Sequence, residues 1–450
     1  MFKRLSGVME PAISLINLIK EVQMQVRMKA IGALASIACM ISIGGCGRQS
    51  DSSSAQDNTA LKTIDAKPAK GEITMWAMGA EGEAMPKFIK QFEQENPDVK
   101  IKLTTLPWSS YREKFRTAVA SGTGPDISMA GNADLAAFSD AFSPAPSNFD
   151  LMDIPMSLRK ISNVNGRQIA IPFYADPRVM FYRTDIAQQA GWNRAPKTWD
   201  ELKQMASDVR KVDGVSSGIY IGPAGTDSFQ NYLFWAYSNG ASIMNADHSK
   251  YTFDTPEFKG ALEYTTDLFK TGIADPNVSI EAGADLQQFV AGKIPIMFTS
   301  PYALTELKKL GGEDFNNRYA TAVLPKSKSS TSFVGGANVA VWKNSKNKQA
   351  AWKYIQWFLK PETQVEFYKA SSDLPASTKA TQNKVLSDNP KMVPFLEQVK
   401  DVKSVPYAST WPQLLAYSDK EFEHICKGTV TVDAGLADIQ KQADSLGVGK

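Results

Sequence analysis

The stretch ITMWAMGAEGEAMPKFIKQFEQENPDVKIKLTTLPWSSYREKFRTAVASGTGPDISMA, from Ile73 to Ala130, alternates short apolar runs with longer amphipathic ones. The short runs predict strands at 73–76, 99–106 and 126–129, and the long runs predict helices at 83–95 and 111–120. Asn96-Pro97-Asp98 and Gly122-Thr123-Gly124-Pro125 end the two helices. Strands that alternate with helices form a parallel sheet, so this stretch predicts an α/β fold with ligands at the carboxyl ends of the strands.

A crossover is predicted further along, between two extended runs at 169–174 and 179–182. Ala175-Asp176-Pro177-Arg178 separates the runs, and proline cannot donate a hydrogen bond inside a central strand. We therefore expect the chain to pass here from one lobe to another. The later elements are predicted as a helix that Thr198 caps with Glu201, helices at 229–237, 256–269, 285–291 and 350–359, and strands at 294–298 and 321–324, the last returning to the first lobe.

The N-terminal region predicts export and a lipid anchor. Arg27 and Lys29 precede an apolar run at 30–45, which is too short to span a membrane comfortably and has the form of a signal peptide. The run closes on Ile43-Gly44-Gly45-Cys46, which resembles a bacterial lipobox. We predict a signal region at 1–45, with the true start at Met24 or Met28, lipidation at Cys46, and a flexible polar tether over 46–70.

Composition excludes several function classes. The segment before Cys46 holds five basic and two acidic residues, which leaves 45 of each in the mature chain and no basic excess for nucleic acid. Cys426 is then the only thiol beside Cys46, and the chain has two histidines, so neither an internal disulfide nor a metal site is expected. Gly214-Val215-Ser216-Ser217-Gly218 matches a nucleophile elbow, but a helix precedes it and a strand follows, the reverse of that motif. We expect no catalytic residue and no cofactor.

Seven segments, taken in order, resemble the extracellular solute-binding proteins typified by maltose-binding protein, which serve ATP-binding-cassette importers. They are ITMWAMG (73–79), FEQENPDVKI (92–101), YREKFRTAVASGTGPDI (111–127), PFYADPRVMFYRTDIAQQAGW (172–192), APKTWDEL (195–202), AGKIPIMFTSPY (291–302) and FVGGANVAVWKNSKNKQAAWKYIQWFLKPE (333–362). The resemblance implies a periplasmic-binding-protein-like fold of two α/β lobes, joined by a hinge of crossing strands around a ligand cleft. Lobe 1 would hold residues 71–175 with about 325–377, and lobe 2 about 179–323 with about 380–450.

The same resemblance implies a function. The protein would capture a carbohydrate on the outer face of the bacterial cell membrane and deliver it, as a monomer, to the permease subunits of an importer. Another polar solute, such as a polyol or a sugar phosphate, is an alternative ligand. A glycoside hydrolase that uses Asp176 with Glu81, and a purely structural surface lipoprotein, are alternatives of other classes.

Aromatic rings can stack on the apolar faces of a sugar, and the chain has nine tryptophans. Most of them are interpreted as core residues: Trp108, Trp192, Trp199, Trp342, Trp352 and Trp357. Stacking on ligand is predicted for Trp76, Trp235 and Trp411, with core packing as the alternative. The resemblance adds Tyr302 as a stacking residue and the backbone of Gly335 and Gly336, unless these glycines form only a turn.

Polar groups would bind the hydroxyls. The resemblance places a carboxylate at the first crossover, so Asp176 is the main candidate, with Tyr174 before it and Arg178 beside it. An ion bridge that fixes the hinge is the alternative for this pair. The further candidates are Glu81, Asn132, Asp134, Gln230 and Asn338. Ala130-Gly131 departs from the family pattern, which often has an acid or an aromatic residue there.

Overall fold

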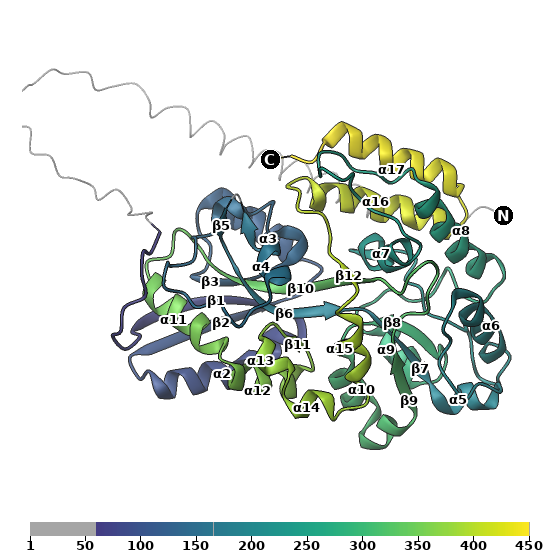
Figure 1. Ribbon diagram of the computed structural model, residues 1–450, viewed down its shortest axis with the longest axis horizontal. Coiled ribbons are helices and arrows are strands. Elements are labelled where there is room, and N and C mark those ends of the chain that lie inside the picture. Colours follow the sequence, from purple (N-terminus) through teal and green to yellow (C-terminus); the bar gives the residue numbers. More distant parts are fainter. Residues whose placement is uncertain (1–59, 165, 450) are drawn as a thin grey trace, which may run out of the picture. The chain divides into compact units, whose positions relative to one another are not determined.

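The computed structural model describes residues 60–164 and 166–449, and Figure 1 shows how their helices and strands follow one another. The predicted signal region and Cys46 lie outside the described residues. Within the described part of the chain, every helix is too short or too polar to cross a membrane.

The larger sheet has seven strands. Its parallel part has β1 (Gly71–Met78) between β2 (Val99–Leu106) and β3 (Ile127–Gly131). The antiparallel part continues from β3 through β10 (Ser332–Val341) and β6 (Ile171–Pro177) to β11 (Leu374–Pro375), while β12 (Val402–Lys403) pairs with the start of β10. Helices α2 (Gly79–Glu95) and α3 (Tyr111–Ser121) connect the parallel strands, as the sequence predicts.

A second, three-stranded sheet is antiparallel, with β7 (Val179–Arg183) between β8 (Ile296–Thr299) and β9 (Tyr319–Ala322). A short hairpin pairs β4 (Asn163–Val164) with β5 (Arg167–Gln168). The other helices are α4 (Met156–Ile161), α5 (Thr184–Gln189), α6 (Trp199–Val209), α7 (Ser228–Ser238), α8 (Pro256–Lys270), α9 (Ala284–Val290), α10 (Ala303–Gly311), α11 (Lys348–Phe358), α12 (Pro361–Ser371), α13 (Thr378–Thr381), α14 (Lys384–Ser387), α15 (Val393–Gln398), α16 (Trp411–Cys426) and α17 (Val432–Leu446), with 3-10 turns η1 (Asn132–Asp134), η2 (Ser139–Ala141) and η3 (Glu313–Asn317).

Two large apolar cores organise the chain. One is formed mainly by β1, β2, β3, α2, α3 and α11, and we call the part around it lobe 1. The other is formed mainly by α6, α7, α8, α16 and α17, and we call the part around it lobe 2. Figure 1 shows α16 and α17 beside α7 and α8, far along the chain from them. A third core lies where β6, β7, β10 and β11 meet, so these strands form the connection between the lobes. The residue bounds of the lobes stay a prediction.

The crossing strands differ in two ways from the prediction. β6 continues through Ala175 and Asp176 to Pro177, which pairs with Val334, so only Arg178 separates it from β7. Pro177 is tolerated because it is the last residue of the strand. The predicted strand at 321–324 corresponds to β9, which pairs with β7 and stays in the second sheet. The strand that returns to lobe 1 is β10.

The end of the predicted tether is fixed on lobe 1 rather than free. Leu61 and Ile64 pack against the lobe 1 core. The carbonyl of Lys62 accepts a hydrogen bond from the backbone of Ser147 at 2.9 Å, and the carboxylate of Asp65 pairs with Lys353. The prediction failed here because two apolar residues in a polar stretch were enough to anchor it.

Candidate functional site

Six of the predicted site residues come together where β6, β10 and β3 lie side by side in the large sheet. Tyr174 and Asp176 lie on β6, and Gly335 lies opposite Asp176 on β10. The amide of Asn132, just after β3, donates to the carbonyl of Gly335 at 2.9 Å. The amide of Asn338 in turn donates to the side-chain oxygen of Asn132 at 2.7 Å. Glu81, in the first turn of α2, completes this group through Tyr174.

Glu81 is a buried carboxyl with two neutral donors. The hydroxyl of Tyr174 donates to Oε1 at 2.9 Å, and the indole of Trp108 donates to Oε2 at 3.4 Å. Burial raises the pKa of Glu81 to about 7, and the negative charge of Asp176 adds to this rise. The hydrogen bonds from Tyr174 and Trp108 lower the pKa only in part, because neither donor carries a positive charge. Glu81 can therefore change its protonation near neutral pH.

Asp176 and Arg178 form an ion pair in which Nη1 lies 2.8 Å from Oδ2. Arg178 also donates to the backbone carbonyl of Asp176 at 3.1 Å and to Asn231 of α7 at 3.1 Å. Both predicted readings of this pair are thus compatible with the geometry, because the bridge uses only one carboxylate oxygen. The other oxygen, Oδ1 of Asp176, is buried and has no hydrogen-bond partner among the described residues.

Tyr302 lies directly before α10 and packs against the third core, where the crossing strands meet. Burial raises its pKa, and the charges of Asp285, Arg178 and Asp176 also act on it, which places the phenol within electrostatic range of the crossover. The ring is half-buried. Tyr302 is therefore the predicted aromatic residue that the structure does bring to the site.

Gly335 and Gly336 lie within β10 and do not form a turn. Gly336 has a φ of 112°, and a Cβ built on it would lie 2.4 Å from the carbonyl oxygen of Tyr174. Only glycine fits there, because any side chain would meet rigid backbone. The close approach of the two strands holds Tyr174 and Asp176 in place.

Four other predicted residues are not brought to this group. Trp76 stacks on Phe115 at 5.8 Å between ring centroids. Trp235 and Trp411 are 3% and 0% exposed and lie in the lobe 2 core. Gln230 accepts a hydrogen bond from the Trp411 indole at 3.3 Å. For the three tryptophans the core-packing alternative describes the observed contacts, and Gln230 is engaged by Trp411, so we leave all four out of the proposed site.

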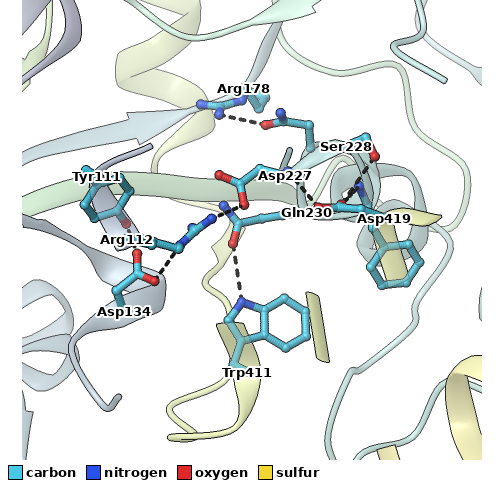
Figure 2. A network of polar contacts seen from close by, with 11 residues as sticks. Tyr111, Arg112, Asp134, Arg178, Asp227, Ser228, Gln230, Trp411 and Asp419 are labelled. Atoms are coloured by element: carbon cyan, nitrogen blue, oxygen red, sulfur yellow. Dashed lines mark hydrogen bonds and ion pairs between the residues drawn. The ribbon is translucent and has the colours of Figure 1, made fainter. Parts of the chain in front are cut away.

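Asp134 lies in η1, directly after β3, where its carboxyl bonds neighbouring side chains (Figure 2). Its predicted contact with ligand stays a prediction. Its carboxyl is fully buried and bonds the Tyr111 hydroxyl and Nε of Arg112, the latter at 2.7 Å. Burial raises its pKa well above the usual range. Gly131 leaves room for this arrangement, since a Cβ there would lie 2.9 Å from the Tyr111 hydroxyl. The sequence departs from the family pattern at Ala130-Gly131 because the Tyr111 hydroxyl occupies the space that a side chain at position 131 would need.

Arg112 joins the two lobes. Its Nη1 lies 2.8 Å from Oδ1 of Asp227, the residue that precedes α7. Asp419 of α16 supports that turn, because its carboxylate accepts from the backbone N–H groups of Asp227 and Phe229, each at 2.9 Å. Figure 2 shows this chain of contacts from Asp134 through Arg112 to Asp227 and Asp419. The lobes are therefore held together by an ion pair beside the site.

Sequence reasoning missed Trp108, Arg112, Asp227 and Asp373. Trp108 follows the end of β2, and its indole bonds Glu81. Its place after a strand end is the signal that could have identified it as a site residue. Arg112 and Asp227 lie in segments far apart in the sequence, which carry no sign that they pair. Asp373 stands beside β11, a strand of two residues that is too short to predict.

The family model described as bacterial extracellular solute-binding protein matches residues 77–365. This chain belongs to that family. A binding protein of Brucella abortus (strain 2308) is 26% identical over 391 residues, covering 84% of this chain and 93% of that protein. The sn-glycerol-3-phosphate-binding periplasmic protein UgpB of Yersinia pseudotuberculosis is 23% identical, covering 83% and 92%.

Solved structures of solute-binding proteins share the fold. Maltose-bound MalE3 of T. maritima superposes with a TM-score of 0.77 at 23% identity, covering 83% of this chain and 99% of that one. A solute-binding protein of Thermotoga lettingae TMO, bound with α-D-tagatose, gives 0.78 at 21% identity, covering 84% and 100%. The predicted two-lobed α/β fold and the predicted family are thus confirmed.

Replacing Asp227 by Asn tests the link between the lobes of this solute-binding protein. Asparagine tolerates the left-handed backbone of Asp227, whose φ is 64°, and removes only the charge that pairs with Arg112. The loss of a partly exposed pair of about 1 kcal/mol would raise the ratio of open to closed forms about fivefold. We expect a larger radius of gyration by small-angle X-ray scattering. Asp254→Asn, an exposed acid of lobe 2, is the control, and an unchanged radius for D227N would contradict the link.

Replacing Glu81 by Gln tests its raised pKa. The folded carboxyl keeps its proton up to a pH of about 7, whereas the unfolded one loses it near 4.5, so ionisation of Glu81 destabilises the folded protein as the pH rises through this window. A shift of this size corresponds to about 3 kcal/mol at most. Urea unfolding at pH 5 and pH 8 should therefore show a smaller loss of stability for E81Q than for the wild type. The exposed Glu281→Gln should keep the wild-type loss, and equal losses in all three proteins would refute the assignment.

Proposed function

We propose that this solute-binding protein captures a carbohydrate at the group formed by Glu81, Asp176, Arg178 and Tyr302, and delivers it to the permease of an ATP-binding-cassette importer. One observation carries the proposal: the buried, unpartnered Oδ1 of Asp176, at the strand that joins the lobes. An unpaired buried acceptor costs about 1–3 kcal/mol, and a ligand hydroxyl would remove this cost. The sugars in the maltose-bound and tagatose-bound relatives support the choice of ligand class.

Capture would work through contacts from both lobes. Glu81 and Asn132 belong to lobe 1 and Asn231 to α7 of lobe 2, while Arg178 lies between the crossing strands and Tyr302 packs against the third core. A ligand can favour a closed form only by the contacts that it makes in that form alone. The closed form would then dock on the permease, which releases the ligand.

Binding without turnover is part of the proposal. A glycosidase needs a protonated acid beside a carboxylate, and Glu81 with its raised pKa near Asp176 resembles such a pair. However, both oxygens of Glu81 already accept hydrogen bonds from Tyr174 and Trp108, and its side chain is buried. We therefore assign it to ligand positioning, and chromatography of incubated sugars tests this by the absence of products.

The main experiment is calorimetric titration with a panel of glucose, tagatose, maltose, maltotriose and mannitol. One or more of them should bind, and Asp176→Asn should weaken that binding at least about tenfold, because a hydrogen bond to a charged group is lost. Asp185→Asn is the matched control, since Asp185 also pairs with an arginine two residues away, Arg183, but lies outside the site. Unchanged affinity in D176N would overturn the site assignment.

We further propose that the chain is held at the outer face of the membrane by lipid on Cys46. In the sequence Cys46 directly follows a signal-like apolar run that ends in Gly44-Gly45. Cys46→Ser should move the protein expressed in bacteria from the detergent phase to the aqueous phase of a Triton X-114 partition. Cys39→Ser, within the predicted signal, should leave partition unchanged, and detergent partition of the Cys46 variant would refute the anchor.

A further inference from the structure

A third carboxyl lies beside the two acids of the site. β11 pairs with β6 so that Leu374 faces Ala175, and this register places Asp373 opposite Asp176. Residues directly opposite in antiparallel strands project from the same face of the sheet. Leu374, Ala175 and Val334 belong to the other face, where they line a cavity of about 480 Å³. The side chain of Asp373 therefore shares the polar face with Asp176.

The buried carboxyl of Asp373 has a neutral partner, the side chain of Ser371, and no positively charged partner among the described residues. Its residue is 2% exposed, and Oδ2 lacks a hydrogen bond within residues 60–164 and 166–449. Burial raises its pKa well above the usual range, and the charges of Glu81 and Asp176 raise it further, so both acids lie within electrostatic range. Two unpartnered carboxyl oxygens thus lie close together, one on Asp176 of β6 and one on Asp373, directly before β11.

The positive groups around these acids are already engaged. Arg178 uses Nη1 for Asp176 and Nη2 for Asn231. The N-terminus of α7 is occupied by the carboxylate of Asp419. The first turn of α2 carries Glu81, whose own backbone N–H bonds its carboxyl. A phosphate group needs free N–H donors or cations, and here it would meet three carboxyls instead.

We propose that Asp373 is a ligand-binding residue, and that with Glu81 and Asp176 it selects an uncharged polyhydroxyl ligand over its phosphorylated counterpart. The unpaired oxygens of Asp176 and Asp373 bond two hydroxyls of one ligand. This inference rests on the proposed capture of a carbohydrate and decides between a sugar and a sugar phosphate. It separates this chain from its glycerol-phosphate-binding relative in Yersinia pseudotuberculosis.

The test titrates the full mature chain at pH 8 with matched pairs: glucose and glucose 6-phosphate, mannitol and mannitol 1-phosphate, glycerol and sn-glycerol 3-phosphate, together with maltose. In a pair that binds, the neutral member should bind at least about a hundredfold more tightly. Asp373→Asn keeps the side-chain volume and removes a buried acid, so the variant should fold, as circular dichroism and its melting temperature will show. Asp373→Asn should weaken the binding of the neutral ligand at least about tenfold. It should also reduce the ratio between the affinities for the neutral and the phosphorylated member of the pair. Asp388→Asn, an exposed acid, should change neither quantity.

The outcomes separate the two proposals. Tighter binding of a phosphorylated member, or unchanged neutral-ligand affinity and discrimination in D373N, overturns the role of Asp373 and leaves carbohydrate capture standing. If no member of the panel binds, carbohydrate capture itself fails and the role of Asp373 fails with it. Weaker neutral binding in D373N, with D388N unchanged, supports the inference.

Discussion

The pairing of β6 with β10 is the constraint on which the site depends. The two strands approach so closely at Gly336 that a side chain there would meet the carbonyl oxygen of Tyr174. Because side chains alternate along a strand, the pairing also sorts residues between two faces. Tyr174 and Asp176 lie on the face that carries the polar group, and Ala175 and Val334 line the apolar cavity on the other. One pair of strands thus connects the lobes and positions the groups that we propose to bind ligand.

The site concentrates buried acids with little positive charge. Glu81, Asp176 and Asp373 lie near one another, and Arg178 is the only cation that pairs with any of the three within the described residues. Burial opposes ionisation and raises the pKa of Glu81 and Asp373. Such an arrangement reduces the stability of the protein alone. In the proposed complex a ligand hydroxyl would supply the missing hydrogen bond, so the cost to stability would be linked to the affinity for ligand.

The contact between the lobes uses a different set of charges. Arg112 is shared by the buried Asp134 of lobe 1 and the partly exposed Asp227 of lobe 2. The first pair belongs to one lobe and can persist in any arrangement, whereas the second exists only when the lobes meet. The ion pair with Asp227 is thus suited to be made and broken as the lobes move.

The sequence by itself determined the α/β class, the family and most of the secondary structure, because periodicity, proline and glycine breaks and ordered motifs are local signals. It also singled out Asp176 and Tyr174 through the family resemblance at the crossover, and Glu81 through its place after the first strand. Only the tertiary structure decided that Trp235 and Trp411 are enclosed by the lobe 2 core, that Pro177 is tolerated at the end of β6, and that Asp373 stands beside Asp176. These facts depend on which distant segments pair and pack, and a side chain's burial and partners are set by such neighbours, which the local pattern does not contain.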